Sequence, residues 1–130
     1  MLRTALAAAL ILTPTLAAAE ILEGVYRTEA NEEGAYLEVT FGACDADASL
    51  TCGTITRAMT PEGPGEDYEH LGRLIVENMD GGPTEWSDGT IWAPDDDETY
   101  RSNMELSGTT LAVEGCFLFI CRGQNWEAVN

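Results

Sequence analysis

The chain has 130 residues, of which 23 are acidic and six are basic, and its formal net charge at pH 7 is −17. The basic residues are all arginines and there is one histidine, which excludes a Schiff-base lysine, a P-loop lysine and a histidine-rich zinc site. Because so acidic a protein repels phosphates and anionic surfaces, we expect no nucleic-acid partner.

Residues 1–19 have the composition of a cleaved export signal. Arg3 supplies a positive start, residues 5–12 are apolar, and alanines lie just before Glu20, as a signal peptidase requires. The alternative, an N-terminal membrane anchor, is disfavoured because the apolar stretch is far shorter than the ~20 residues that span a bilayer. We therefore expect cleavage before Glu20, one mature domain over residues 20–130 without a membrane span, and a periplasmic or secreted location.

Beyond the export signal, the apolar residues recur with a period of two, which is typical of β-strands. Leu37, Val39 and Phe41, for example, share one face of their segment. Strands are predicted for residues 24–28, 35–41, 54–59, 73–78, 90–93, 100–106, 109–115 and 122–128. Turn-forming residues separate these segments, and the two-residue break Ser107-Gly108 predicts a tight hairpin. Residues 66–71 are the best candidate for a helix, of one or two turns.

The predicted fold class is all-β. About eight short antiparallel strands in a mature chain of about 110 residues fit either a meandering barrel or a sandwich, with at most one short helix. An eight-stranded barrel is either filled by its own side chains or holds one small ligand. The sequence leaves both alternatives open.

The four cysteines lie in two close pairs, Cys44 with Cys52 and Cys116 with Cys121. Each pair flanks a short segment that can turn back on itself, so we favour the two local pairings among the three that four cysteines allow. Loops of this size stabilise a fold by roughly 2–3 kcal/mol each in the chain-entropy model. The alternative is a metal site or a redox pair, but the cysteines have neither the CxxC spacing nor the histidine partners of a zinc site. Disulfides also fit an exported protein.

Several short motifs follow one another along the mature chain. They are Gly24-Val25-Tyr26-Arg27-Thr28, Cys52-Gly53-Thr54-Ile55, Leu71-Gly72, Trp86, Gly89-Thr90-Ile91-Trp92 with Pro94, Thr99-Tyr100, Val113-Glu114-Gly115-Cys116 and Cys121-Arg122-Gly123-Gln124-Asn125-Trp126. In this order and spacing they resemble the bacterial exported family called domain of unknown function 2147. The resemblance implies a small lipocalin-like (calycin-like) β-barrel in the cell envelope, with no established reaction. Tyr26 departs from the family pattern, in which a tryptophan is usual.

A set of apolar and aromatic residues is predicted to face the interior. The set comprises Phe41, Ile55, Met59, Ile91, Tyr100, Met104, Leu111, Val113 and Trp126. Ordinary core is one interpretation, and the lining of a pocket for an irregular apolar ligand is the other. Arg57 alternates in step with Ile55 and Met59, so it is a candidate for holding an anionic head group inside the barrel, where an unpaired charge would be costly.

Three further features have both a structural and a functional interpretation. Tyr26 and Arg122 are predicted to stack as a closure of the barrel, as in lipocalin-like proteins, with an arginine clamp for a carboxylate ligand as the alternative. His70 is predicted to be exposed in a polar connector, with general acid or base catalysis as the alternative. Residues 95–98, all acidic, are predicted to form a solvated turn, with weak calcium binding as the alternative.

The leading functional hypothesis is a non-enzymatic exported barrel that binds a small apolar or amphipathic molecule. The first alternative is an envelope interaction or structural module with a filled core, and the second is an enzyme of unknown reaction. We predict no catalytic residue, metal or cofactor, because the sequence contains no G-x-S-x-G nucleophile motif, metal-ligand cluster or dinucleotide-binding fingerprint.

Overall fold

The computed structural model describes residue 8 and residues 19–130, so the predicted export signal lies almost wholly outside the described residues. Nine strands lie within these described residues: β1 (Gly24–Arg27), β2 (Tyr36–Ala43), β3 (Thr51–Thr60), β4 (Gly63–Pro64), β5 (Leu74–Gly81), β6 (Glu85–Ala93), β7 (Glu98–Ser107), β8 (Thr110–Phe117) and β9 (Ile120–Ala128). Eight of them coincide with the predicted segments. The short strand β4 was not predicted.

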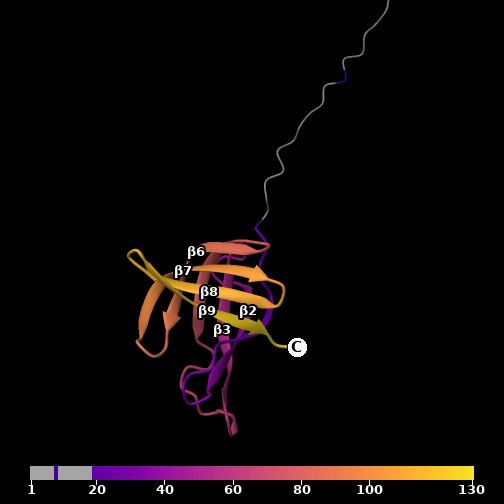
Figure 1. The fold of residues 1–130 in the computed structure, drawn as a ribbon. Coiled ribbons are helices and arrows are strands. Elements are labelled where there is room, and N and C mark those ends of the chain that lie inside the picture. Colours follow the sequence, from indigo (N-terminus) through magenta and orange to yellow (C-terminus); the bar gives the residue numbers. More distant parts are fainter. Residues whose placement is uncertain (1–7, 9–18) are drawn as a thin grey trace, which may run out of the picture.

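Eight strands form a closed antiparallel barrel (Figure 1). Their order around the ring is β2, β1, β9, β8, β7, β6, β5 and β3, the pairing of β2 with β3 closes the ring, and β4 pairs with β3 outside it. This closure confirms the predicted eight-stranded barrel and excludes the sandwich. Connections alternate between the two ends: we call the end with the β1–β2, β6–β7 and β8–β9 connections the open end, and the opposite end the closed end.

The half of the barrel toward the closed end is filled with side chains. Its buried members include Leu22, Val39, Phe41, Ile55, Met79, Trp86, Met104 and Leu111. The segment before β1 crosses this end: the Leu22 backbone N–H donates to Thr51 Oγ1 over 3.1 Å, and Trp86 Nε1 donates to the Glu20 carbonyl over 2.9 Å. Gly82 has a φ of +100°, and a Cβ there would collide with the same carbonyl. The chain therefore seals this end tightly.

A β-bulge in β3 decides which way one predicted site residue points. Glu38 pairs with Arg57 but Val39 pairs with Ile55, so Thr56 is an extra residue opposite β2. A bulge of this kind reverses the alternation beyond it. Ile55 faces the core, whereas the Arg57 side chain is 54% exposed and lies 3.7 Å from the Glu38 carboxylate on the outside of the barrel. The prediction that Arg57 faces inward is wrong.

Residues 66–71 form consecutive turns and not the predicted helix. The backbone N–H of Tyr68 donates to the Gly65 carbonyl, and that of Leu71 donates to the Tyr68 carbonyl, over 3.2 and 3.3 Å. These i→i+3 bonds do not continue into a helical ladder. The segment connects β4 to β5, and the rings of Tyr68 and His70 meet edge to face at 5.3 Å, so packing against neighbouring side chains sets its conformation.

Both predicted local disulfides are formed, at opposite ends of the barrel. Cys44 and Cys52 join the β2–β3 connection to β3, and Cys116 and Cys121 join β8 to β9. Paired cysteines are typical of proteins that fold in an oxidising compartment. In the part of the chain that the structure describes, no helix has the length and apolar character to cross a membrane.

The shortest pairing in the ring joins the first and last strands. Tyr26 pairs with Ala128 and Arg27 pairs with Glu127, and the ladder between β1 and β9 has only these two register pairs. Beyond them, the Glu29 carboxylate accepts the Asn125 backbone N–H over 2.7 Å. A side chain thus extends this seam toward the open end.

Candidate ligand-binding site

A cavity of about 1150 Å³ occupies the open half of the barrel. Its walls come from the ends of the strands and from the connections gathered at the open end. The volume is comparable with the 300–1,000 Å³ or so that is usual for small-molecule sites. The barrel interior is therefore filled at one end and hollow at the other.

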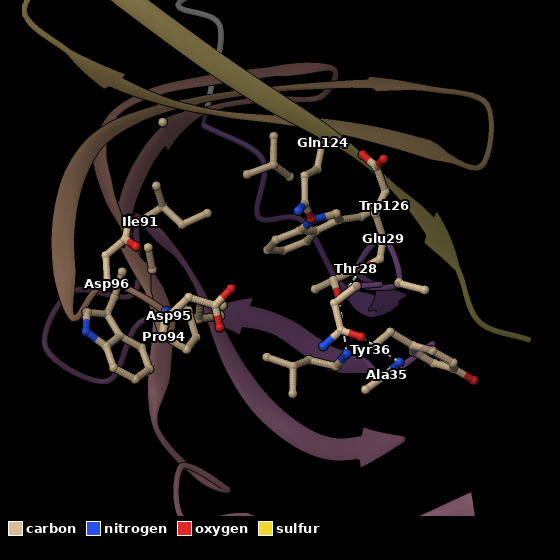
Figure 2. A pocket seen from close by; sticks show the side chains of 18 of the residues that line it. Thr28, Glu29, Ala35, Tyr36, Ile91, Pro94, Asp95, Asp96, Gln124 and Trp126 are labelled. Atoms are coloured by element: carbon tan, nitrogen blue, oxygen red, sulfur yellow. Dashed lines mark hydrogen bonds between the residues drawn. The ribbon is translucent and has the colours of Figure 1, made fainter. Parts of the chain in front are cut away.

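The inner walls of the cavity are apolar. They are formed by Leu37, Ala58, Ile75, Ile91, Val113 and Trp126, among others. Figure 2 shows Ile91 and Pro94 on one side of the open space and Thr28 on the other, with Trp126 between them and the Tyr36 ring directed away from the space. The Trp126 indole N–H donates to Gln124 Oε1 over 2.9 Å. Because this polar atom is already satisfied, the ring presents an apolar surface to the cavity.

The rim of the cavity is acidic. Five carboxylates line it, from Glu29, Asp67, Asp95, Asp96 and Glu98, against the single guanidinium of Arg122. Figure 2 shows Glu29 on one side of the mouth and the two aspartates of the β6–β7 turn on the other. The charged side chains at the mouth thus carry an excess of negative charge.

Two tyrosines at the mouth have a pKa above the ordinary value of a phenol. The Tyr100 hydroxyl donates to Asp96 Oδ2 over 3.4 Å. Loss of solvent, then the charge and hydrogen bond of Asp96 and the charge of Glu98, raise the pKa of Tyr100 above its ordinary value of 10.0. Burial, with smaller effects of the charges of Asp95 and Glu69, likewise raises the pKa of Tyr68. Both phenols keep their protons at neutral pH, and that of Tyr100 is donated to Asp96.

A cluster of aromatic and charged side chains braces the cavity wall from behind. The Trp92 ring lines the cavity and its indole N–H donates to Asp97 Oδ1 over 2.9 Å. Arg73 stacks on this ring, and the His70 ring meets it edge to face at 4.9 Å. The cluster fixes the β4–β5 connection against β6.

His70 is not the exposed side chain that we predicted. It is 25% exposed, lies between the rings of Tyr68 and Trp92, and places Nε2 3.2 Å from Glu69 Oε1. The prediction was wrong because it treated the connector as solvated, whereas the connector folds back onto Trp92. The residues that line the cavity include Tyr68 and Trp92 but not His70, so the imidazole does not face a ligand held there.

The predicted pocket residues divide into three groups. Ile91, Tyr100 and Trp126 line the cavity, and Met59 lies at its edge, on the face of β3 that also carries Arg57. Phe41, Ile55 and Met104 are 4%, 0% and 3% exposed and belong to the filled half, so they do not reach it. Arg57 lies outside the barrel.

The predicted stacking of Tyr26 on Arg122 is not formed. Tyr26 pairs with Ala128, six residues further along β9 than Arg122, and a strand rises by about 3.3 Å per residue. Tyr26 packs edge to face against Phe41 instead, with ring centroids 5.7 Å apart, and Arg122 lines the cavity mouth. Period-two alternation of Arg122 with Gln124 and Trp126 was the pattern that could have revealed this shared inward face.

Of the acidic residues 95–98, the three aspartates lie in an exposed turn and Glu98 begins β7. Two of the carboxylates in the turn accept protein donors, Asp96 from Tyr100 and Asp97 from Trp92. Among the described residues, one group of three side chains is close enough to hold a metal ion, Glu114 with Cys116 and Cys121. Its two sulfur atoms are joined in a disulfide, so they are not the thiolates that metals bind.

The sequence model of a bacterial family described as "Uncharacterized protein conserved in bacteria (DUF2147)" matches residues 24–128. The chain belongs to this family. The match spans all the strands of the barrel. No curated protein matches the chain.

A solved structure with a similar fold is that of HP1028 from the human pathogen Helicobacter pylori, described as belonging to the lipocalin family. The TM-score is 0.63 at 12% sequence identity, over 84% of this chain and 83% of that one. At this identity the similarity establishes the lipocalin-like fold of this DUF2147 protein.

Proposed function

We propose that this DUF2147 protein is a non-enzymatic carrier that acts in the periplasm or outside the cell and binds a small apolar or amphipathic molecule in the cavity at the open end. The observation that carries the proposal is the division of the barrel into a filled half and a hollow half of about 1150 Å³. The two disulfides and the composition of residues 1–19 support the extracytoplasmic location.

The apolar wall of the cavity favours binding of an apolar ligand. Leu37, Ala58 and Ile91 expose apolar surface to the cavity, and each Å² of such surface that a ligand removes from water contributes roughly 25 cal/mol to binding. A protein selected only for stability would fill this space with larger side chains, because close packing is the rule in protein interiors. The hollow therefore favours a carrier over a module with a filled core.

The rim indicates the polar end of the ligand. Five carboxylates against one guanidinium repel an anionic head group and attract a cationic one. A neutral head group is able to accept a hydrogen bond from the Tyr68 hydroxyl. We therefore propose a ligand with an apolar body and a neutral or cationic polar end, and not the anionic head group that Arg57 suggested from the sequence.

The test is titration with N-phenyl-1-naphthylamine, a neutral apolar dye that becomes fluorescent when it leaves water. Ile91→Trp fills the cavity from its wall. Thr90→Trp adds the same side chain to the neighbouring position, which points to the other face of β6, and serves as the matched control. We expect saturable binding to the native protein and to Thr90→Trp, and binding to Ile91→Trp that is weaker by about tenfold or more.

The proposal fails if the native protein does not bind the dye, or if both variants bind as tightly as the native protein does. Either result would favour the interaction module, whose working surfaces lie on the outside. Circular dichroism of the two variants checks that the barrel is intact.

A further inference from the structure

The hairpin between β8 and β9 ends in four consecutive large apolar residues, Phe117, Leu118, Phe119 and Ile120, which we call the apolar tip. Their exposed fractions are 64%, 71%, 101% and 65%. The other exposed large apolar residues among those described, Leu71, Leu74 and Val129, reach only 38–40%. The apolar tip is therefore the main patch of exposed apolar surface on the described part of the chain, and such patches are characteristic of contact sites.

The apolar tip is held rigidly in this exposed position. Phe117 pairs with Ile120, and directly beneath them Cys116 pairs with Cys121 and is bonded to it. Only two residues make the turn, and the first, Leu118, has a φ of 55°. So tight a turn leaves no length of chain with which the apical side chains could fold back onto the barrel.

Two of the few positive charges of the protein flank the apolar tip. Arg101 Nη2 lies 3.5 Å from the Leu118 carbonyl oxygen, and Arg122 follows Cys121 directly. An apolar projection with guanidinium groups at its base suits the interface of a phospholipid bilayer, where arginines bind phosphates while apolar side chains enter the acyl region.

The area of the apolar tip argues against a second copy of the chain as the occupant. Its four side chains together offer roughly 500 Å², whereas a stable interface buries about 800 Å² on each partner. The patch is also convex, so two copies would touch at a point. A bilayer imposes neither requirement, because it closes around whatever enters it.

We propose that the apolar tip inserts into the surface of a phospholipid bilayer, with Arg101 and Arg122 on the lipid phosphates. Phe117 and Ile120 also line the cavity, so insertion brings the cavity mouth to the membrane surface. The insertion itself does not require a ligand in the cavity, so it goes beyond the proposed carrier function. The large negative charge of the protein makes a zwitterionic bilayer the preferred surface.

The experiment is flotation with vesicles of phosphatidylcholine. We expect the native protein to float with the vesicles, and the double variant Leu118→Asn with Phe119→Ser to lose binding by about tenfold or more, because two apolar anchors are removed. Asparagine tolerates the positive φ at position 118. Val129→Asn, which removes an exposed apolar residue from the opposite end of the barrel, is the control and floats like the native protein.

A native protein that stays unbound overturns the proposal, as does a double variant that floats like the native protein. Sedimentation without lipid tests the second copy: a native dimer that the double variant abolishes also overturns it. Ile91→Trp, which blocks the cavity, is expected to float normally, so failure of the carrier function and failure of membrane binding are separate results. As a second measurement, the fluorescence of Phe119→Trp is expected to be quenched by brominated phosphatidylcholine, and absence of quenching counts against insertion.

Discussion

The guanidinium carbon of Arg73 lies 3.3 Å from the centroid of the Trp92 ring, and Nη2 of the same arginine lies 4.0 Å from Asp97 Oδ1. That same carboxylate oxygen accepts the Trp92 indole N–H. Three side chains thus join the start of β5, the end of β6 and the β6–β7 turn. Since Trp92 is also part of the cavity wall, this contact holds the mouth of the barrel in shape.

Removal of the stacked guanidinium is expected to weaken the fold. Arg73→Ala should lower the free energy of unfolding by about 1 kcal/mol, since a partly exposed cation–π contact contributes roughly 0.5–2 kcal/mol. Arg73→Lys should retain part of this stabilisation, because an ammonium keeps the charge but not the flat stacking surface. Urea unfolding gives the measurement, with Arg27→Ala on the exterior of β1 as the control. Equal loss in both alanine variants would show that the contact is not specific.

Each disulfide is expected to stabilise the barrel separately. Replacing Cys44 and Cys52 by serine, or Cys116 and Cys121, should lower the free energy of unfolding by roughly 2–3 kcal/mol for each pair. The loops are short and lie at opposite ends, so the two effects should add. Thermal unfolding of the two double variants and of the quadruple variant tests this, and a quadruple variant as stable as either double variant would contradict it.

The acidic rim is expected to discriminate between amphiphiles of equal chain length. Dodecylamine should bind more tightly than dodecanol, and dodecanoate most weakly, because the carboxylates at the mouth act on the charge of the head group. Calorimetry measures the three affinities. Asp95→Asn with Asp96→Asn should narrow the differences, as should added salt. Tighter binding of dodecanoate would instead indicate that Arg122 dominates the mouth.

The raised pKa of Tyr100 predicts a loss of stability at alkaline pH. The stabilising contribution of the neutral phenol is fully present below its ordinary pKa of 10.0. Above that pH the unfolded chain ionises while the folded one does not, so the free energy of unfolding falls as the pH rises through the raised pKa of the folded state. Asp96→Asn should lower the pKa of Tyr100, as followed by tyrosinate absorbance. An unchanged titration curve would show that Asp96 does not act on the phenol.

The fold was largely predictable because local rules decide it. Alternation such as that of Leu37, Val39 and Phe41 fixes which side chains face inward, and turn residues separate the strands. The orientation of Arg57 was not predictable, because the extra residue Thr56 opposes β2 only once the two strands have paired. The division into filled and hollow halves also depends on tertiary structure. Ile55 and Ile91 are both isoleucines in alternating segments, and only their position along the barrel axis places one in the core and the other in the cavity wall.

The two register pairs between β1 and β9 make this junction the weakest line around the barrel. By comparison, β8 and β9 pair along eight register positions. Backbone amides at the first junction should exchange with deuterated water sooner than those between β8 and β9, because fewer ladder bonds must break. Widening of the mouth for a bulky ligand would then begin at the open end of this junction, where only the Glu29 carboxylate continues the hydrogen bonding between β1 and β9. The barrel would open between its first and last strands.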